Sequence, residues 1–299
     1  MIDFKSLETF IWVATLRSFR GAAEKLNTTQ PAISTRIAQL EDFLGIRLLE
    51  RDRRRVAPTP KGHEFLVHAE RLVRLRGEMI EAVGDRSTVR GIVRLGVSES
   101  IVHTWLPALI KRVNEAYSNL ELEIDVDISP KLRDSLVGRG LDLAFLVGPI
   151  DNPNIHSHPL CSFPLAFIAA DTIPCPRGPM TLEQIAQRPL ITFARNTQPH
   201  MALRELLARN GLRATIHASA SLEAVVRMAL DGVGIAVMPP AIIGKKAEAR
   251  QKLRRLNTRV RLPDLNFVVG WPAAPDNFAA QKVAEIALQV ARVGRHTRA

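Results

Sequence analysis

Five side chains that can form hydrogen bonds with DNA bases lie close together in the sequence. They are Gln30, Ser34, Thr35, Arg36 and Gln39, in the stretch QPAISTRIAQ (30–39). In the major groove of DNA, Gln can pair with adenine, Arg with guanine or a phosphate, and hydroxyl groups with several acceptors. Side chains of these types could therefore read a base sequence, provided that one helix presents them together.

Local signals place these residues on the second helix of a helical pair. Thr29 can cap that helix, and Pro31 falls in its first turn, where a missing N–H costs little. A helix is expected before it over 19–26, with Ser18 as its cap and Asn27 at its end. The apolar stripe of the second helix consists of Ile33, Ile37, Leu40 and Leu44. The pair predicts a helix-turn-helix, although an ordinary amphipathic helix with a solvated face has the same pattern.

A basic hairpin is expected after this helix, which Gly45 ends. The hairpin consists of a strand, a charged turn and a returning strand, at 47–51, 52–55 and 56–59. Such a wing would bring Arg51, Arg53 and Arg54 near the phosphate backbone of DNA. Because Asp52 interrupts the basic cluster, a solvated charged turn is the alternative.

Together these features resemble the winged helix-turn-helix of LysR-type transcriptional regulators. The resemblance is carried by Phe10, by SFRGAAEKLNTTQPAISTRIAQLEDFLGIRLLER (18–51) and by PTPKG (58–62). Leu49 departs from the family pattern, which usually has Phe there, but an apolar exchange in a packed position is tolerated. The resemblance implies that the DNA-contacting positions are Gln30, Pro31, Ser34, Thr35 and Arg36. It also implies an interrupted dyad operator, often near the regulator's own promoter.

A long helix is expected after the wing. Apolar residues recur over 63–83 at spacings of four and three, as in a coiled-coil seam: Phe65, Ala69, Leu72, Met79 and Val83. Arg76 lies in the same seam and fits it only if its charged end reaches solvent, so packing of the helix against its own domain is the alternative. In LysR-type regulators this helix is the dimerising linker, and the resemblance implies a homodimer or a homotetramer. The predicted domains are residues 1–62 for DNA binding, 63–90 for the linker helix and hinge, and 91–299.

Strands and helices alternate in the last two hundred residues, which predicts an α/β fold with mainly parallel sheets. The expected strands are 92–97, 120–128, 141–147, 164–170, 190–193, 214–218, 235–239 and 265–271. The expected helices are 101–113, a short one before 141, 200–210, 222–230 and 278–293. We expect two subdomains with a cleft between them, at about 91–161 plus 265–299 and about 162–264. The resemblance implies an effector domain similar to periplasmic binding proteins.

Polar residues follow the carboxyl ends of these strands, where α/β folds bind ligands. The candidate effector-binding residues are Ser98, Ser100, Ser129, Gly148, Asn196, Thr197 and Ser221. Each hydroxyl or amide could instead serve only as a helix cap or a turn residue, and Gly148 offers only its backbone. Hydroxyl groups at helix N-termini in a basic protein suit an organic acid. Glu99 would repel such an acid if it faces the cleft.

The composition restricts the function classes. The formal net charge of +11 favours a polyanionic partner such as double-stranded DNA. Only two cysteines are present, so disulfides are not the framework, and no Cys/His cluster has the spacing of a metal site. No apolar run is long enough to span a bilayer, and the N-terminus lacks the features of a signal peptide. We therefore expect a cytoplasmic protein without a metal or cofactor and without a membrane partner.

Two other function classes explain part of the sequence. A transport-type solute-binding protein would account for the cleft, but not for residues 18–62, and it would need a signal peptide. An enzyme of α/β type would need a catalytic arrangement, and the candidates Glu99, His103 and His200 form only a weak one. The leading interpretation is a DNA-binding regulator controlled by a small-molecule effector. RNA polymerase is its expected further partner.

Overall fold

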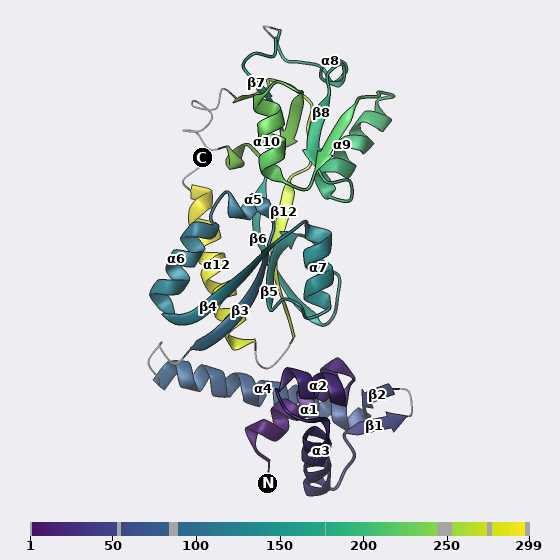
Figure 1. Ribbon diagram of the computed structural model, residues 1–299, viewed down its shortest axis with the longest axis vertical. Coiled ribbons are helices and arrows are strands. Elements are labelled where there is room, and N and C mark those ends of the chain that lie inside the picture. Colours follow the sequence, from purple (N-terminus) through teal and green to yellow (C-terminus); the bar gives the residue numbers. More distant parts are fainter. Residues whose placement is uncertain are drawn as a thin grey trace. The chain divides into compact units, whose positions relative to one another are not determined.

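The computed structural model describes residues 2–52, 55–83, 89–176, 178–243, 253–273 and 277–296. The chain forms two compact units (Figure 1). The first comprises Met1–Gly91 with Tyr117–Leu120 and Ala273–Lys282. The second comprises Ile92–Ala116, Glu121–Pro272 and Val283–Ala299. Each unit is built on its own hydrophobic core.

Three helices begin the first unit, and each starts at a side-chain cap. The helices are α1 (Phe4–Leu16), α2 (Phe19–Lys25) and α3 (Gln30–Leu44). The caps are Asp3, Ser18 and Thr29, whose side-chain oxygens accept from the N–H groups of Ser6, Gly21 and Ala32. Asn27 and Gly45 adopt positive φ angles of 48° and 66° after α2 and α3. The predicted caps Ser18 and Thr29 and the predicted helix ends are therefore confirmed.

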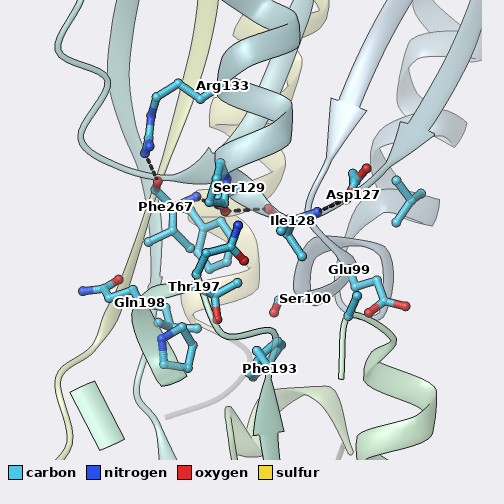
Figure 2. A pocket seen from close by; sticks show the side chains of 18 of the residues that line it. Glu99, Ser100, Asp127, Ile128, Ser129, Arg133, Phe193, Thr197, Gln198 and Phe267 are labelled. Atoms are coloured by element: carbon cyan, nitrogen blue, oxygen red, sulfur yellow. Dashed lines mark hydrogen bonds between the residues drawn. The ribbon is translucent and has the colours of Figure 1, made fainter. Parts of the chain in front are cut away.

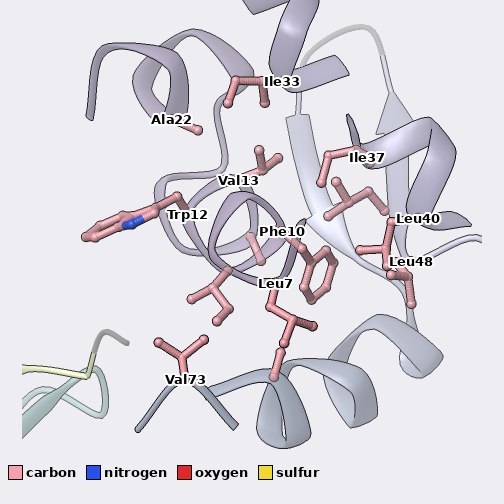
Figure 3. Packing of buried hydrophobic residues seen from close by; sticks show 14 of the residues in the cluster. Leu7, Phe10, Trp12, Val13, Ala22, Ile33, Ile37, Leu40, Leu48 and Val73 are labelled. Atoms are coloured by element: carbon pink, nitrogen blue, oxygen red, sulfur yellow. The ribbon is translucent and has the colours of Figure 1, made fainter. Parts of the chain in front are cut away.

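The core of this unit holds α3 against α1 (Figure 3). Phe10, Ala22, Ile33 and Ile37 are fully buried, and Leu40 is nearly so. The small side chain of Ala22 lets α2 approach its neighbours closely. Burying an Ile side chain stabilises a fold by about 1.5–3 kcal/mol. The orientation of α3 is thus fixed by its apolar stripe, which leaves the other side of the helix to solvent.

The wing and the long helix complete the unit. Strands β1 (Leu49–Asp52) and β2 (Arg55–Pro58) pair antiparallel, and α4 runs from Pro60 to Val83. Helix α4 packs along α1, where Phe65 meets Phe10 edge-to-face with ring centroids 5.2 Å apart. The hairpin and the helix have the predicted order, with boundaries shifted by up to three residues.

The predicted coiled-coil seam of α4 is divided between two faces. Ala69 and Val73 are buried in the core with α1, and Arg76 donates to Glu8 Oε1 at 3.0 Å. Leu72 and Met79, by contrast, are 47% and 58% exposed. Part of the apolar spacing of α4 therefore serves packing within the domain, and a dimer seam through its exposed residues stays a prediction. The predicted hinge residues 84–88 lie outside the described residues.

Two five-stranded sheets form the second unit. The first has the order β4-β3-β5-β12-β6, with β4 at Asn119–Val126, β3 at Arg90–Val97, β5 at Leu143–Val147, β12 at Leu265–Pro272 and β6 at Ile155–Phe163. The second has the order β11-β7-β10-β8-β9, with β11 at Leu253–Arg255, β7 at Ala166–Ala170, β10 at Ile235–Met238, β8 at Leu190–Phe193 and β9 at Ile216–Ser219. The helices are α5 (Glu99–Val102), α6 (Leu106–Ala116), α7 (Ser129–Val137), α8 (Leu182–Ala186), α9 (Gln198–Arg209), α10 (Leu222–Leu230), η2 (Pro240–Ile242) and α12 (Phe278–His296). None of the described helices is long and apolar enough to cross a membrane.

Three expectations about this unit need correction. The sheets are mixed rather than mainly parallel, because β12 runs antiparallel to β5 and β6, and β7 runs antiparallel to β10 and β11. Strand β6 was missed because Pro159 interrupts its pattern, which an edge strand tolerates. The helix expected over 101–113 is two helices, α5 and α6, since Pro107 fits only the first turn of a new helix.

Candidate functional site

The leading end of α3 presents polar side chains to solvent. Gln30, Pro31, Thr35 and Gln39 are exposed, and Ser34 is half-buried. Because the buried stripe fixes the roll of the helix, these residues lie on the surface that a DNA groove could reach. The structure therefore leaves four of these side chains accessible on α3 and the fifth, Ser34, partly so.

Arg36 points toward α1 instead. Its Nη1 donates to Thr9 Oγ1 at 3.1 Å, and Thr9 is fully buried. Arg36 also lies close enough to Asp3 to lower the pKa of that carboxyl, although hydrogen bonds from Ser6 are the larger cause. The guanidinium thus connects α3 to α1, and DNA would have to compete with Thr9 for it.

Glu41 fixes the wing relative to α3. Its Oε1 accepts hydrogen bonds from the backbone N–H groups of Leu48 and Leu49, at 2.8 and 3.0 Å. One carboxylate oxygen therefore ties the start of the hairpin to the last turns of the helix. Sequence reasoning recorded Glu41 only as part of a family motif and missed this structural role.

Thr59 and Gly62 hold the other end of the wing. The Thr59 hydroxyl donates to Arg47 O at 2.9 Å and accepts from Gly62 N–H at 2.9 Å. A Cβ at Gly62 would lie 2.0 Å from Leu48 O, so only glycine fits this contact. The Thr and Gly of the stretch PTPKG (58–62) are thus explained by the junction between the hairpin and α4.

The basic residues of the wing are less completely described. The backbone of Arg51 pairs with Val56 in the hairpin. Arg53 and Arg54 lie outside the described residues, as does the side chain of Arg51. Their contact with phosphate therefore stays a prediction.

A cavity of about 610 Å³ opens in the second unit (Figure 2). It is lined by residues that follow strands of both sheets, including all seven candidate effector-binding residues: Ser98, Ser100, Ser129, Gly148, Asn196, Thr197 and Ser221. Its apolar walls include Ile128, Phe193 and Phe267. The structure thus brings together polar groups that are separated by up to 123 positions in the sequence, as the reasoning from strand ends required.

Two serines form a hydrogen-bonded pair in this cavity. Ser129 Oγ accepts from Val147 N–H at 2.9 Å, and Ser98 Oγ lies 3.1 Å from Ser129 Oγ. The pair has two hydroxyl protons, and one of them is used between the two oxygens. Within the described residues the other proton has no acceptor, so it is available to a group in the cavity.

Helices α7, α9 and α10 of the second unit begin at the cavity, as does the four-residue helix α5. Helix α7 starts after Ile128, which has no side chain that could cap it. The Thr197 side chain makes no cap hydrogen bond to α9, and its hydroxyl donates to Ala194 O at 2.6 Å. The first N–H groups of a helix have no partner within it, and the N-terminus carries about half a positive elementary charge. The starts of α7 and α9 can therefore attract the negative group of a ligand.

The third helix, α10, is already capped. Ser221 Oγ accepts from Ala224 N–H at 3.3 Å, and Glu99 Oε2 accepts from Leu222 N–H. Glu99 follows β3 of the first sheet, so its carboxylate connects this sheet to a helix of the second. It lines the cavity, as we considered from the sequence, but its charge faces a helix N-terminus.

Arg133 is a cavity residue that sequence reasoning missed. It lies on α7, and its Nη2 donates to the carbonyls of Val147 and Pro149 at 3.1 and 3.2 Å. Its Nε is buried without a hydrogen-bond partner in the described structure. The sequence could have indicated this residue, because Arg133 lies one turn after the candidate Ser129 on the same expected helix and therefore on the same face.

The histidines considered as catalytic candidates do not line the described cavity. His200 is buried on α9, and its pKa is lowered, mainly by burial and then by Arg204 and Arg195. The described residues contain no group of three or more side chains suited to hold a metal ion.

Comparison with known proteins identifies the family. Residues 4–63 match the family "Bacterial regulatory helix-turn-helix protein, lysR family", and residues 86–292 match "LysR substrate binding domain". The chain belongs to the LysR family. This LysR-type transcriptional regulator combines a helix-turn-helix DNA-binding domain with an effector-binding domain, and regulators of the family bind DNA and small-molecule effectors. The sequence-based family assignment, fold class and function are thereby confirmed.

Relatives and solved structures cover nearly the whole LysR-type chain. It is 24% identical over 269 residues to the HTH-type transcriptional regulator GltR of Bacillus subtilis, which covers 89% of this chain and 90% of that protein. It is 26% identical over 243 residues to AlsR of Bacillus subtilis, covering 80% of each. A full-length OxyR variant from Pseudomonas aeruginosa has a similar fold, with a TM-score of 0.61, 21% identity and coverage of 98% of this chain and 95% of that chain.

Proposed function

We propose that this LysR-type regulator reads an operator with the leading end of α3. The contacts to bases come from Gln30, Ser34, Thr35 and Gln39, with Pro31 against the backbone or an apolar base edge. The observation that carries this proposal is the exposure of Gln30, Thr35 and Gln39 on a helix whose apolar stripe is buried. Gln and hydroxyl groups suit the major-groove edges of bases.

Arg36, Arg51, Arg53 and Arg54 complete the proposed DNA surface. The arginines of the wing contact phosphates and contribute affinity for any sequence. The base contact predicted for Arg36 stays a prediction, and the bond to Thr9 supports a second role for this residue, the positioning of α3.

We further propose that the cavity between the two sheets binds a small organic acid. Its hydroxyl groups, its two uncapped helix starts and Arg133 support this class of effector. The effector-binding residues in this proposal are those named above for the cavity. Binding changes the conformation in which a homodimer or homotetramer holds an interrupted dyad operator, and hence its contact with RNA polymerase.

The proposal is tested by fluorescence anisotropy with the full chain. Binding to a duplex from its own upstream region is compared with binding to a random duplex at about 0.15 M salt. A sequence reader binds its operator at least about a thousandfold more tightly than random DNA. Equal affinity for all duplexes, including a genomic library of fragments, would refute sequence reading by α3.

The roles of α3 and the wing are separated by two variants. Thr35→Ala should weaken binding to the operator by about 1–3 kcal/mol and leave binding to random DNA unchanged. Arg53→Ala should weaken binding to both duplexes alike and reduce the salt dependence. If Thr35→Ala lowers both affinities equally, Thr35 is not a base contact.

A further inference from the structure

The charged and hydrogen-bonding groups of the cavity are separated by sign. Figure 2 shows Arg133, Thr197 and Gln198 on one side and Glu99 and Asp127 on the other. This separation bears on the class of effector, because a ligand that fills the cavity meets donors at one end and a carboxylate at the other.

The donor side has room for one carboxylate. Two uncapped helix starts, each equivalent to about half an elementary charge, together balance about one negative charge. A third donor is Ser100, whose side chain lines the cavity although the residue is only 3% exposed, and whose hydroxyl has no partner in the described structure. The spare proton of the Ser98–Ser129 pair is a fourth.

The opposite side keeps an excess of negative charge. Asp127 forms an ion pair with Lys131 at 3.2 Å, so its charge is compensated. Glu99 forms no ion pair with a described residue, and only one of its oxygens accepts a hydrogen bond, from the start of α10. That helix start, and the start of the short helix α5 whose first residue is Glu99, offset part of the charge of Glu99, but neither supplies a full positive charge. Glu99 lines the cavity, and its second oxygen, Oε1, accepts no hydrogen bond from a described residue, so it is available to a ligand.

These observations exclude the start of α10 as the place for an effector's acid group, because Glu99 already occupies it. A ligand that carries only a carboxylate would leave the charge of Glu99 unbalanced inside a partly apolar cavity, which is unfavourable. A neutral donor could bond to Oε1, but only a cation also balances the charge.

We propose that the effector is an amino carboxylate, with its acid group at the starts of α7 and α9 beside Ser100 and its ammonium group at Glu99. The apolar walls formed by Phe193 and Phe267 receive the carbon skeleton between the two groups. This inference rests on the proposed effector function of the cavity and names the ligand class more narrowly than an organic acid.

Matched ligand triplets test the proposal on the full-length protein. Each triplet contains an amino carboxylate, the same skeleton without the amino group, and the same skeleton without the carboxylate. Suitable sets are L-leucine, isocaproate and isoamylamine; L-phenylalanine, hydrocinnamate and phenethylamine; and γ-aminobutyrate, butyrate and n-propylamine. Thermal shift measurements screen all nine compounds, and calorimetry gives the Kd of those that bind. We expect at least one amino carboxylate to bind at least about tenfold more tightly than both of its partners.

Glu99→Gln provides the decisive variant. Its amide oxygen can still accept from Leu222 N–H, so the cap of α10 is kept while the charge is removed. We expect the variant to bind the amino carboxylate more weakly and the plain acid more tightly, so that their Kd ratio falls at least about tenfold. A merely structural role of Glu99 would weaken both ligands alike. Glu121→Gln, an exposed site on β4 outside the cavity lining, is the matched control.

The outcomes separate the two levels of the proposal. If plain acids bind as tightly as their amino carboxylates, or if Glu99→Gln leaves the Kd ratio unchanged, the amino carboxylate inference is overturned while the organic-acid function stands. If no compound of any triplet binds to a protein that still binds its operator, both the inference and the proposed acid site are overturned.

Discussion

Arg36 offers a direct test of how the DNA-reading helix is positioned. Its guanidinium donates to the buried hydroxyl of Thr9 on α1, and this hydrogen bond joins side chains of the two helices. A hydrogen bond to a charged group contributes about 1.5–3 kcal/mol when buried, and the half-exposed position of Arg36 reduces this to about 1 kcal/mol. For a domain of this size, such a loss lowers the Tm by about 4–8 °C.

The perturbation is a double-mutant cycle with Arg36→Ala and Thr9→Val. Thr9→Val removes the acceptor, and with it the bond from Thr9 Oγ1 to Lys5 O, but keeps the shape of the buried side chain. We expect each single variant to lower the free energy of unfolding by about 1 kcal/mol or more, and the double variant to lose about 1 kcal/mol less than the sum of the two. Thermal or urea unfolding measures these differences. Arg71→Ala, at an exposed site on α4, controls for the loss of a positive charge.

The same variants are then compared for DNA binding by anisotropy. If Arg36 acts by positioning α3, Thr9→Val reproduces the loss of affinity seen with Arg36→Ala, although Thr9 is buried and cannot touch DNA. If Arg36 instead contacts a base, Arg36→Ala costs about 1–3 kcal/mol on the operator alone and Thr9→Val has no effect. The second pattern, together with an unchanged Tm for Thr9→Val, would refute the positioning role.

Three further predictions concern the wing junction, the cavity and the pH dependence of stability. Gly62→Ala should destabilise the DNA-binding domain by about 3 kcal/mol, because the new Cβ would overlap Leu48 O. Gly21→Ala is the control and should stabilise the domain by about 0.5 kcal/mol, because its Cβ would have no contact closer than 3.4 Å. Urea midpoints measure both changes, and equal effects of the two variants would contradict the close contact at Gly62. Ser129→Ala should cost about 1–3 kcal/mol in urea unfolding because Val147 N–H loses its acceptor, and an unchanged midpoint would show that water replaces the hydroxyl. Folding lowers the pKa of His200 below its ordinary value of 6.5, so the unfolded chain binds the proton more readily than the folded chain. The contribution of His200 to the free energy of unfolding is therefore complete above pH 6.5 and is lost as the pH falls toward the folded pKa. Tm values between about pH 7.5 and 5.5 should therefore fall less for His200→Gln than for the unchanged protein, and parallel profiles would disprove this contribution.

Local signals in the sequence were sufficient for the helix-turn-helix. The caps Ser18 and Thr29, the residue Asn27 and the glycine Gly45 act on their immediate neighbours, so their roles follow from the residues beside them. The same holds for most strands and helices of the second unit, but β6, where Pro159 hid the pattern, and the short elements β11 and α8 were not predicted. Strand ends also located the seven polar residues that line the cavity.

Contacts between distant segments could not be predicted in this way. The apolar spacing of α4 does not say which of its residues face α1, and the structure assigns Ala69 and Val73 to the core while Leu72 stays exposed. The hydrogen bond from Arg36 to Thr9, which precedes it by 27 positions, could not be predicted. Helical spacing gives the face of the helix on which a side chain lies, but not the residue that it contacts.

The sequence by itself determined the family, the order of the elements and the set of polar groups at the strand ends, because these depend on local patterns. Tertiary structure alone decided what those groups do to one another. It placed Glu99 at the start of α10, 123 positions away, and left the starts of α7 and α9 uncapped. These long-range contacts decide which charge each end of the cavity presents to a ligand. The effect of the Glu99 carboxylate on a charged ligand depends on how far the helix start beside it already neutralises its charge.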